Sequence, residues 1–114
     1  MKFSDLSVAE ILAIVEPIMD NCLAGSNEND HGKHARDFTK RMHSIVTPEE
    51  LSRQLSLEPR GYFTQREFLG LFRRQQSIGV VWKQYTSLNT DELINQAIFK
   101  EESGKVLIDH CMIC

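Results

Sequence analysis

The apolar residues of this chain change their spacing near residue 61, and this change restricts the fold more than any other feature. Before it, apolar residues recur every three or four positions, which is the period of an amphipathic helix. After it, segments rich in β-branched and aromatic residues partly alternate with polar ones, which is typical of strands. Helices followed by strands predict an α+β domain.

The first predicted helix spans residues 7–23. Ser7 and Glu10 match a capping box, in which each side chain satisfies a backbone N–H of the other residue. Apolar positions then recur at helical spacing: Ile11, Ile14, Val15, Ile18 and Cys22. Pro17 should kink this helix because it lacks a backbone donor and collides with the preceding turn. Gly25 should end the helix before a polar loop.

Two further helices are expected before the strands begin. One should span residues 30–43. The other, at residues 47–56, has the clearest start signal in the chain. There Thr47 is the expected N-cap, Pro48 takes the first helical position and Glu50 closes a second capping box. The sequence therefore predicts three N-terminal helices.

The second half predicts an antiparallel meander. The segments "SIGVVWKQYTS" and "ELINQAIFK" are expected strands, and "EESG" is the turn that leads into a last strand, "KVLIDHCMI". The segment "FTQREFLGLFRRQQ" fits a helix or a strand, because Thr64 and Glu67 again resemble a capping box. Gly70 within it and a turn at "QQS" favour a strand.

Composition is that of an ordinary water-soluble domain. The 114 residues form one domain, 1–114, with 41% hydrophobic and 25% charged residues. A net charge of −3 argues against nucleic acid as a partner, although the middle of the chain is basic. No signal peptide or membrane-spanning apolar run is recognised, so no membrane is expected. An odd count of 3 cysteines suggests reduced thiols and a cytoplasmic location.

The helix and strand segments together carry a resemblance to a known superfamily. "DFTKRMHSIVTPEEL", "SIGVVWKQYTS" and "ELINQAIFKEESGKVLID" resemble the cone-shaped superfamily of ketosteroid isomerase and nuclear transport factor 2, in its uncharacterised bacterial branches. The resemblance implies helices packed on a curved antiparallel sheet that encloses a cone-shaped pocket. It also implies a homodimer formed through the sheet. The catalytic acid of the isomerase branch has no matching position here, so no catalytic residue is carried over.

Five residues on the expected strands are candidates for binding a ligand in such a pocket. In the cone-shaped fold the concave face of the sheet lines the cavity, and polar groups there would orient a ligand. The candidates are Trp82, Gln84, Tyr85, Asn95 and His110. The competing interpretation is that Trp82 belongs to the core or to a dimer interface.

Two charged clusters are weaker candidates. One is a group of His31, His34, Asp37 and His43, of which the first three are spaced three residues apart and could share a helix face as metal ligands, but surface side chains are the favoured interpretation. We therefore assign no metal ligand and no cofactor. The arginines could clamp an anion, or could be charges that discourage sheet edges from aggregating. They are Arg60, Arg66, Arg73 and Arg74.

The C-terminal "IDHCMIC" suggests a redox Cys-x-x-C pair, an Asp-His dyad or a prenylation signal. Strict alternation along a strand separates these residues. One face would carry Val106, Ile108, His110, Met112 and Cys114, and the other Leu107, Asp109, Cys111 and Ile113. No polybasic spacer accompanies the possible lipid signal. A last strand is therefore expected, in which His110 is a weak candidate for a general acid or base.

These patterns favour a non-catalytic module that binds a small molecule or a partner in a cone-shaped cavity. One alternative is a lyase or isomerase that uses acid-base catalysis with His110 as proton carrier. Another is a structural dimer that binds no ligand.

Overall fold

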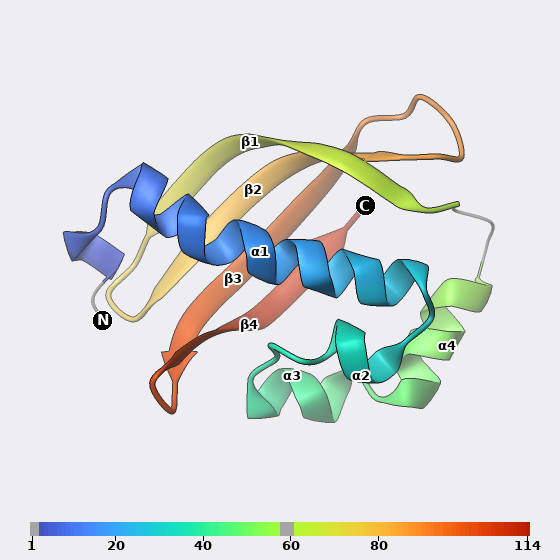
Figure 1. Ribbon diagram of the computed structural model, residues 1–114, viewed down its shortest axis with the longest axis horizontal. Coiled ribbons are helices and arrows are strands. Elements are labelled where there is room, and N and C mark those ends of the chain that lie inside the picture. The colour runs from blue at the N-terminus through green and yellow to red at the C-terminus, as the bar shows by residue number, and fades with distance from the viewer. Residues whose placement is uncertain (1–2, 58–60) are drawn as a thin grey trace.

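The structure is a computed structural model that describes residues 3–57 and 61–114. Two layers form it: a four-stranded antiparallel sheet, and helices that cover one of its faces (Figure 1). We call the helix-covered side of the sheet the inner face and the opposite side the outer face. The predicted α+β class and the predicted antiparallel meander are confirmed.

The sheet has the simple strand order β1-β2-β3-β4. Its strands are β1 (Phe63–Arg73), β2 (Ser77–Thr86), β3 (Leu93–Glu102) and β4 (Lys105–Ile113). The ambiguous segment before residue 74 is the strand β1, as favoured from the sequence. It is a strand because Phe68 and Leu71 pair with Trp82 and Val80 and pack against the core on the inner face.

The predicted turn between β3 and β4 is confirmed. Glu102 pairs with Lys105, and the two residues between them, Ser103 and Gly104, have φ angles of 55° and 78°. Two successive left-handed residues make the tight turn whose twist suits an antiparallel hairpin. Glycine adopts this conformation at little cost, so Gly104 helps to fix the register of β4 on β3.

Helix α1 (Val8–Asn27) crosses the inner face of the sheet (Figure 1). The predicted capping box is present, since Ser7 Oγ accepts from Glu10 N at 3.1 Å and Glu10 Oε1 accepts from Ser7 N at 2.9 Å. The helix continues through Pro17, which lies on its exposed side. It also continues past Gly25, so the predicted helix end and the start of the polar loop were wrong. A short 3₁₀ turn (Phe3–Asp5) precedes α1.

Gly25 is instead a point of close approach between helices. A Cβ atom at Gly25 would lie 2.3 Å from the backbone N of His34, in α2 (His31–His34). Glycine is therefore required because the backbones of the two helices nearly touch, and not because the chain turns there.

The single helix predicted for residues 30–43 was wrong, because it is divided into α2 and α3 (Lys40–Ile45). Between them Phe38 forms a parallel bridge to Ile108 of β4. Thr39 N donates to Ile108 O at 3.0 Å, and Ile108 N donates to Asp37 O at 2.7 Å. These bonds bind the chain to the sheet edge in an extended form, which a continuous helix could not adopt.

Helix α4 (Pro48–Ser56) forms where the sequence predicted it. Thr47 is its N-cap and accepts a hydrogen bond from Glu50 N at 3.1 Å. The Glu50 carboxylate accepts from Arg53 and Gln54 instead of closing the capping box.

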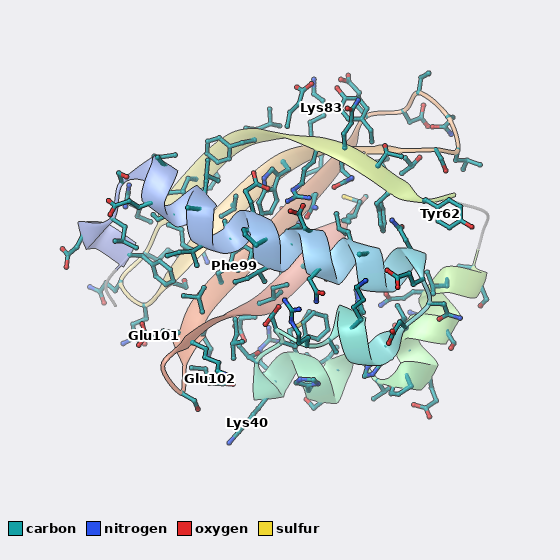
Figure 2. All side chains as sticks on the ribbon, in the orientation of Figure 1. Lys40, Tyr62, Lys83, Phe99, Glu101 and Glu102 are labelled. Carbon is teal, nitrogen blue, oxygen red and sulfur yellow. The ribbon has the colours of Figure 1, made fainter. Side chains whose placement is uncertain are left out.

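The core lies between α1 and the sheet. Its fully buried members include Ile11, Val15 and Met19 from α1 and Ile78, Val80, Trp82, Phe99 and Ile108 from the strands. Phe99 lies between α1 and the sheet (Figure 2). Three consecutive turns of α1 supply one residue each, so this part of the helix packs closely on the inner face.

A β-bulge at Asp109 overturns the predicted alternation of the last strand. Ile108 pairs with Phe99 but His110 pairs with Ile98, so Asp109 is an extra residue in β4. Side chains beyond the bulge therefore exchange faces, and Cys111 joins Ile108 on the inner face. The single face predicted to carry both Ile108 and His110 does not exist.

Candidate functional site

One concave feature is a cleft of about 500 Å³. It lies where the end of α1, together with α2, α3 and α4, meets the end of the sheet at which β1 and β3 begin. We call this feature the cleft. Most of its lining side chains are apolar: Leu23, Phe38, Met42, Val46, Leu57, Phe63, Leu93, Met112 and Ile113. The remaining ones are Cys22, Ser26, His34, Gln54, Thr86, Cys111 and Cys114.

His34 lies beside Cys22 on the helix side of the cleft. His34 Nδ1 lies 2.8 Å from the backbone O of Cys22 and 3.5 Å from its Sγ. The first distance fits a hydrogen bond in which the Nδ1–H of His34 donates to the Cys22 carbonyl. This contact links α2 to α1 and fixes the orientation of the ring.

The two inner thiols of the cleft are unreactive at neutral pH. Burial raises the pKa of Cys22 well above its usual range, and the neighbouring Cys111 and Asp37 raise it further. Burial alone raises the pKa of Cys111 to about 12. A thiol must lose its proton to act as a nucleophile or to ligate a metal. Both side chains therefore contribute small apolar surface to the cleft rather than chemistry.

Three of the five sequence-predicted ligand residues lie beneath the cleft, not in it. Trp82, Gln84 and Asn95 face inward and are fully buried. Asn95 Nδ2 donates to Gln84 Oε1 at 3.2 Å, and Gln84 Nε2 donates to the backbone oxygens of Gln65 and Tyr85. In the described part of the chain, no buried side-chain nitrogen or oxygen lacks a hydrogen-bond partner. These amides therefore stabilise the sheet.

The buried amides nevertheless contact one wall of the cleft. Cys111 Sγ lies 3.8 Å from Asn95 Oδ1, a distance that fits a weak S–H donor. Cys111 also lines the cleft, so the amide pair of Asn95 and Gln84 supports this wall from below.

Trp82 belongs to an ion-pair network that joins α1 to β1 and β2. Its Nε1 donates to Glu16 Oε2 at 3.1 Å, and the Arg66 guanidinium lies 5.2 Å from the ring centroid. Arg66 in turn pairs with Glu16 and, at 2.8 Å, with Asp20. These contacts and its full burial fit the competing interpretation, in which Trp82 is a core residue.

The other two predicted ligand residues, Tyr85 and His110, lie on the outer face. The Tyr85 hydroxyl is 3.3 Å from Glu67 Oε1 and 3.4 Å from Glu92 Oε2. His110 pairs with Ile98, whose side chain also points away from the helices. None of the five predicted residues lines the cleft.

The two charged clusters do not assemble into sites. His31 Nε2 contacts Val46 O at 2.7 Å, whereas His34 faces Cys22 and Asp37 pairs with Arg36. Among the residues that the structure describes, no three potential ligands gather around a metal position.

The arginines are equally dispersed. Arg66 binds α1, and Arg73 donates to the backbone oxygens of Phe3 and Leu6 at 2.7 Å each. Arg74 is exposed, and Arg60 lies outside the described residues. Arg66 and Arg73 both hold the N-terminal part of the chain to β1 instead of converging on an anion.

Sequence reasoning missed the residues that do line the cleft. Most come from the helical half of the chain, from helices and from the segments that join or end them (Cys22, Leu23, Ser26, His34, Phe38, Met42, Val46, Gln54 and Leu57). One available signal was the apolar series of α1, which places Cys22 on the same stripe as Ile11 and Val15. No local pattern marks the bulge that turns Cys111 toward the cleft.

Comparisons with models of protein families, with curated proteins and with solved structures find no match to this chain. Within the described ranges, no helix is both long and apolar enough to cross a membrane.

Proposed function

We propose that this chain is a binding module whose cleft accepts an apolar ligand. The observation that carries the proposal is the cleft itself, about 500 Å³ in volume and lined mainly by aliphatic, aromatic and methionine side chains. This volume lies within the range of about 300–1,000 Å³ that is usual for ligand pockets. Apolar lining with a few polar groups at one wall is also the usual chemistry of such pockets.

The cone-shaped superfamily remains our proposed relationship. A four-stranded antiparallel meander, helices on one face and a cleft open at one end of the sheet are consistent with it. Fold resemblance alone does not choose between binding and catalysis.

The position of His110 and the raised pKa values of the cleft thiols count against the enzymatic alternative. The proton carrier of the enzymatic alternative, His110, lies on the outer face, away from the cleft. Inside the cleft, the thiols of Cys22 and Cys111 have raised pKa values, and His34 Nδ1 contacts the Cys22 carbonyl. A general acid or base needs a titrating group within hydrogen-bond reach of a substrate. The protonated thiols do not supply one.

The neutral fluorescent probe N-phenyl-1-naphthylamine tests this proposal. Thr86 lines the cleft at the end of β2, so Thr86→Trp should fill part of it and weaken probe binding about tenfold, or about 1.4 kcal/mol. Thr64→Trp places the same ring on an exposed position of β1 and should leave the affinity unchanged. Saturable binding of one probe per chain is expected. Absence of saturation, or equal effects of the two variants, would refute a ligand-binding cleft.

We also propose that a second copy of the chain covers the outer face of the sheet. That face carries apolar side chains on all four strands: Phe72, Val81, Ile94, Ile98 and Met112. Phe72, Ile94 and Met112 are each about half exposed, at 57%, 51% and 48%. Exposed apolar side chains gathered on one face can mark an interface between chains, and a two-fold dimer would bury them against each other.

Sedimentation equilibrium tests the dimer. Val81 lies at the centre of the outer face, so Val81→Lys should convert a dimer into a monomer. Val8→Lys, at an exposed apolar position of α1, is the matched control and should leave the mass unchanged. A wild-type chain that sediments as a monomer at micromolar concentration would contradict the proposal.

A further inference from the structure

β4 is the last strand of the sheet, and one part of its free edge is already occupied. Ile108 exchanges hydrogen bonds with Asp37 and Thr39, so residues 37–39 lie along the edge as a short extended segment. At the bulge, the Asp109 carbonyl accepts from the Arg41 side chain. The edge is therefore satisfied from within the chain at Ile108 and Asp109.

Beyond the bulge the edge is open. Ile94 and Cys114 exchange hydrogen bonds of 2.9 and 3.0 Å across β3 and β4. Such pairs alternate along an antiparallel ladder, so Met112 and His110 also bond to β3. The N–H and C=O groups of Cys111 and Ile113 then point away from β3. Among the described residues, no backbone partner is found for them.

The cleft runs along this open edge. Cys111 and Ile113 face inward, whereas Met112 and Cys114 face outward, yet all four line the cleft. A cavity whose wall includes residues of both faces extends around the edge or the end of the strand. The unpaired backbone groups of Cys111 and Ile113 therefore border an apolar space.

We infer that the ligand of the cleft is an extended peptide segment that adds to β4 as a further strand at Cys111 and Ile113. This inference rests on the proposed function of the cleft. Backbone donors and acceptors that repeat every second residue, about 6.8 Å apart, match those of another strand. Alternate side chains of the peptide then enter the cleft and must be apolar, because Phe38, Met42 and Val46 line it.

The segment at residues 37–39 shows that this edge accepts an extended backbone. It pairs with Ile108 in the parallel sense and then leaves the edge, because α3 begins at Lys40. The incoming peptide would occupy the next stretch of the same edge, where the chain supplies no strand of its own. A purely apolar small molecule could fill the cleft but would leave the four backbone groups of Cys111 and Ile113 unpaired.

A displayed library of seven-residue peptides, with apolar residues at alternate positions, tests the inference on the full-length chain. The enriched peptide is synthesised in two N-methylated forms, each blocking one set of alternate amides. One set of amides points toward β4 and the other points away from it. One form should therefore bind at least tenfold more weakly, by calorimetry, and the other should bind as the parent peptide does.

A pair of chain variants provides the reciprocal test. Ile113→Pro removes an N–H that points away from β3 and keeps the hydrogen bonds between β3 and β4. Edge strands tolerate proline at positions of this kind. Ile113→Ala removes a comparable amount of side chain but keeps the N–H. The peptide should bind Ile113→Pro at least tenfold more weakly than Ile113→Ala, whereas the naphthylamine probe should bind both alike. If Ile113→Pro does not fold, the two N-methylated peptides on the wild-type chain decide alone.

The outcomes separate the two proposals. Saturable probe binding without any enriched peptide would overturn the strand-addition inference and leave the binding cleft intact. Equal loss with both N-methylated forms, or none with either, would also overturn it, because pairing with one edge requires an asymmetry. Absence of both probe and peptide binding would overturn both proposals.

Discussion

The two ends of the space between α1 and the sheet differ in what fills it. At the end near residues 11–15 of α1, side chains of helix and strands interdigitate, and Ile11, Val15 and Phe99 are completely buried. At the other end, the last turns of α1 border the cleft. There α1 packs against α2, through Gly25, and α3 is fixed to β4 through Thr39 and Asp109.

The difference shows how one amphipathic helix can supply both a core and a cavity wall. Where α1 lies directly on the sheet, the two apolar faces exclude water from each other. Where short helices separate it from the edge of the sheet, the same apolar stripe faces open space. The stability of the molecule should therefore come mainly from the first end, and its binding function from the second.

The largest effect on the free energy of unfolding is expected from one of two alanine substitutions, made at opposite ends of the space between α1 and the sheet. Phe99→Ala removes a fully buried ring from the closed end and should lower the free energy of unfolding by about 3–5 kcal/mol. Leu93→Ala, at a half-buried position of the cleft, should lower it by only about 1 kcal/mol, because folding removes only part of this side chain's surface from water. Urea denaturation measures both. Equal losses would mean that the cleft end is packed as tightly as the core.

The next prediction concerns the ion pairs that hold α1 to the sheet. The Arg66 side chain is only 9% exposed, and its removal leaves Glu16 without its cationic partner and the Trp82 ring uncovered. Arg66→Ala should therefore cost about 2 kcal/mol. Arg53→Ala breaks an exposed pair with Glu50 and should have a much smaller effect on stability, because exposed ion pairs are screened by solvent. Similar costs in thermal denaturation would show that the Arg66 network contributes no more than a surface pair.

A smaller effect should appear as a pH dependence at the open end. Burial raises the pKa of Asp109, but hydrogen bonds from Thr39 and Arg41 and the charges of Arg41 and Lys100 outweigh burial, so the pKa is lowered overall. A carboxyl whose pKa is lowered on folding stabilises the protein above its unfolded pKa, about 3.9, and loses this contribution as pH falls through the folded value.

Asp109→Asn should therefore be about 1 kcal/mol less stable than the wild type at pH 6, and this difference should shrink below pH 4. Asp91→Asn, at an exposed site between β2 and β3, should leave the stability curve unchanged. Denaturant titrations at several pH values measure both variants. A difference that grows as pH falls would have the wrong sign for the proposed contacts.

The smallest effect involves no loss of stability. Cys114 is exposed, whereas burial raises the pKa values of Cys22 and Cys111. Iodoacetamide at pH 8 should modify one thiol per chain at least tenfold faster than the other two, because the thiolate is the reactive form. Mass spectrometry identifies the site, and Cys114→Ser should remove the fast phase. Early labelling of Cys111 would indicate that the cleft wall opens.

Features with a local cause could be predicted from the sequence. The capping box of Ser7 and Glu10, the start of α4 at Thr47 and Pro48, and the turn at Gly104 each depend on residues within a few positions of one another. Such signals depend little on the rest of the chain, so these three elements were found where the sequence predicted them.

Features with a distant cause could not be predicted. The break between α2 and α3 depends on Phe38 meeting Ile108, and the bulge depends on Asp109 meeting Thr39 and Arg41. A periodic pattern contains no information about such pairs. The candidate ligand residues were chosen by strand alternation and by resemblance, so they fell on the core and on the outer face. The cleft is formed chiefly by residues of the helical half of the chain.

Gly25 has a consequence for how far this sequence can diverge. Even a single methyl group at this position would lie 2.5 Å from the backbone Cα of His34 and would force α2 away from α1. Most cleft positions should tolerate exchange of one apolar residue for another. A side chain at position 25, in contrast, would separate α1 from α2, which both line the cleft. Chains that share the cleft but little other sequence should therefore still have glycine at this position, followed by a histidine nine residues later if the Cys22 carbonyl contact is retained.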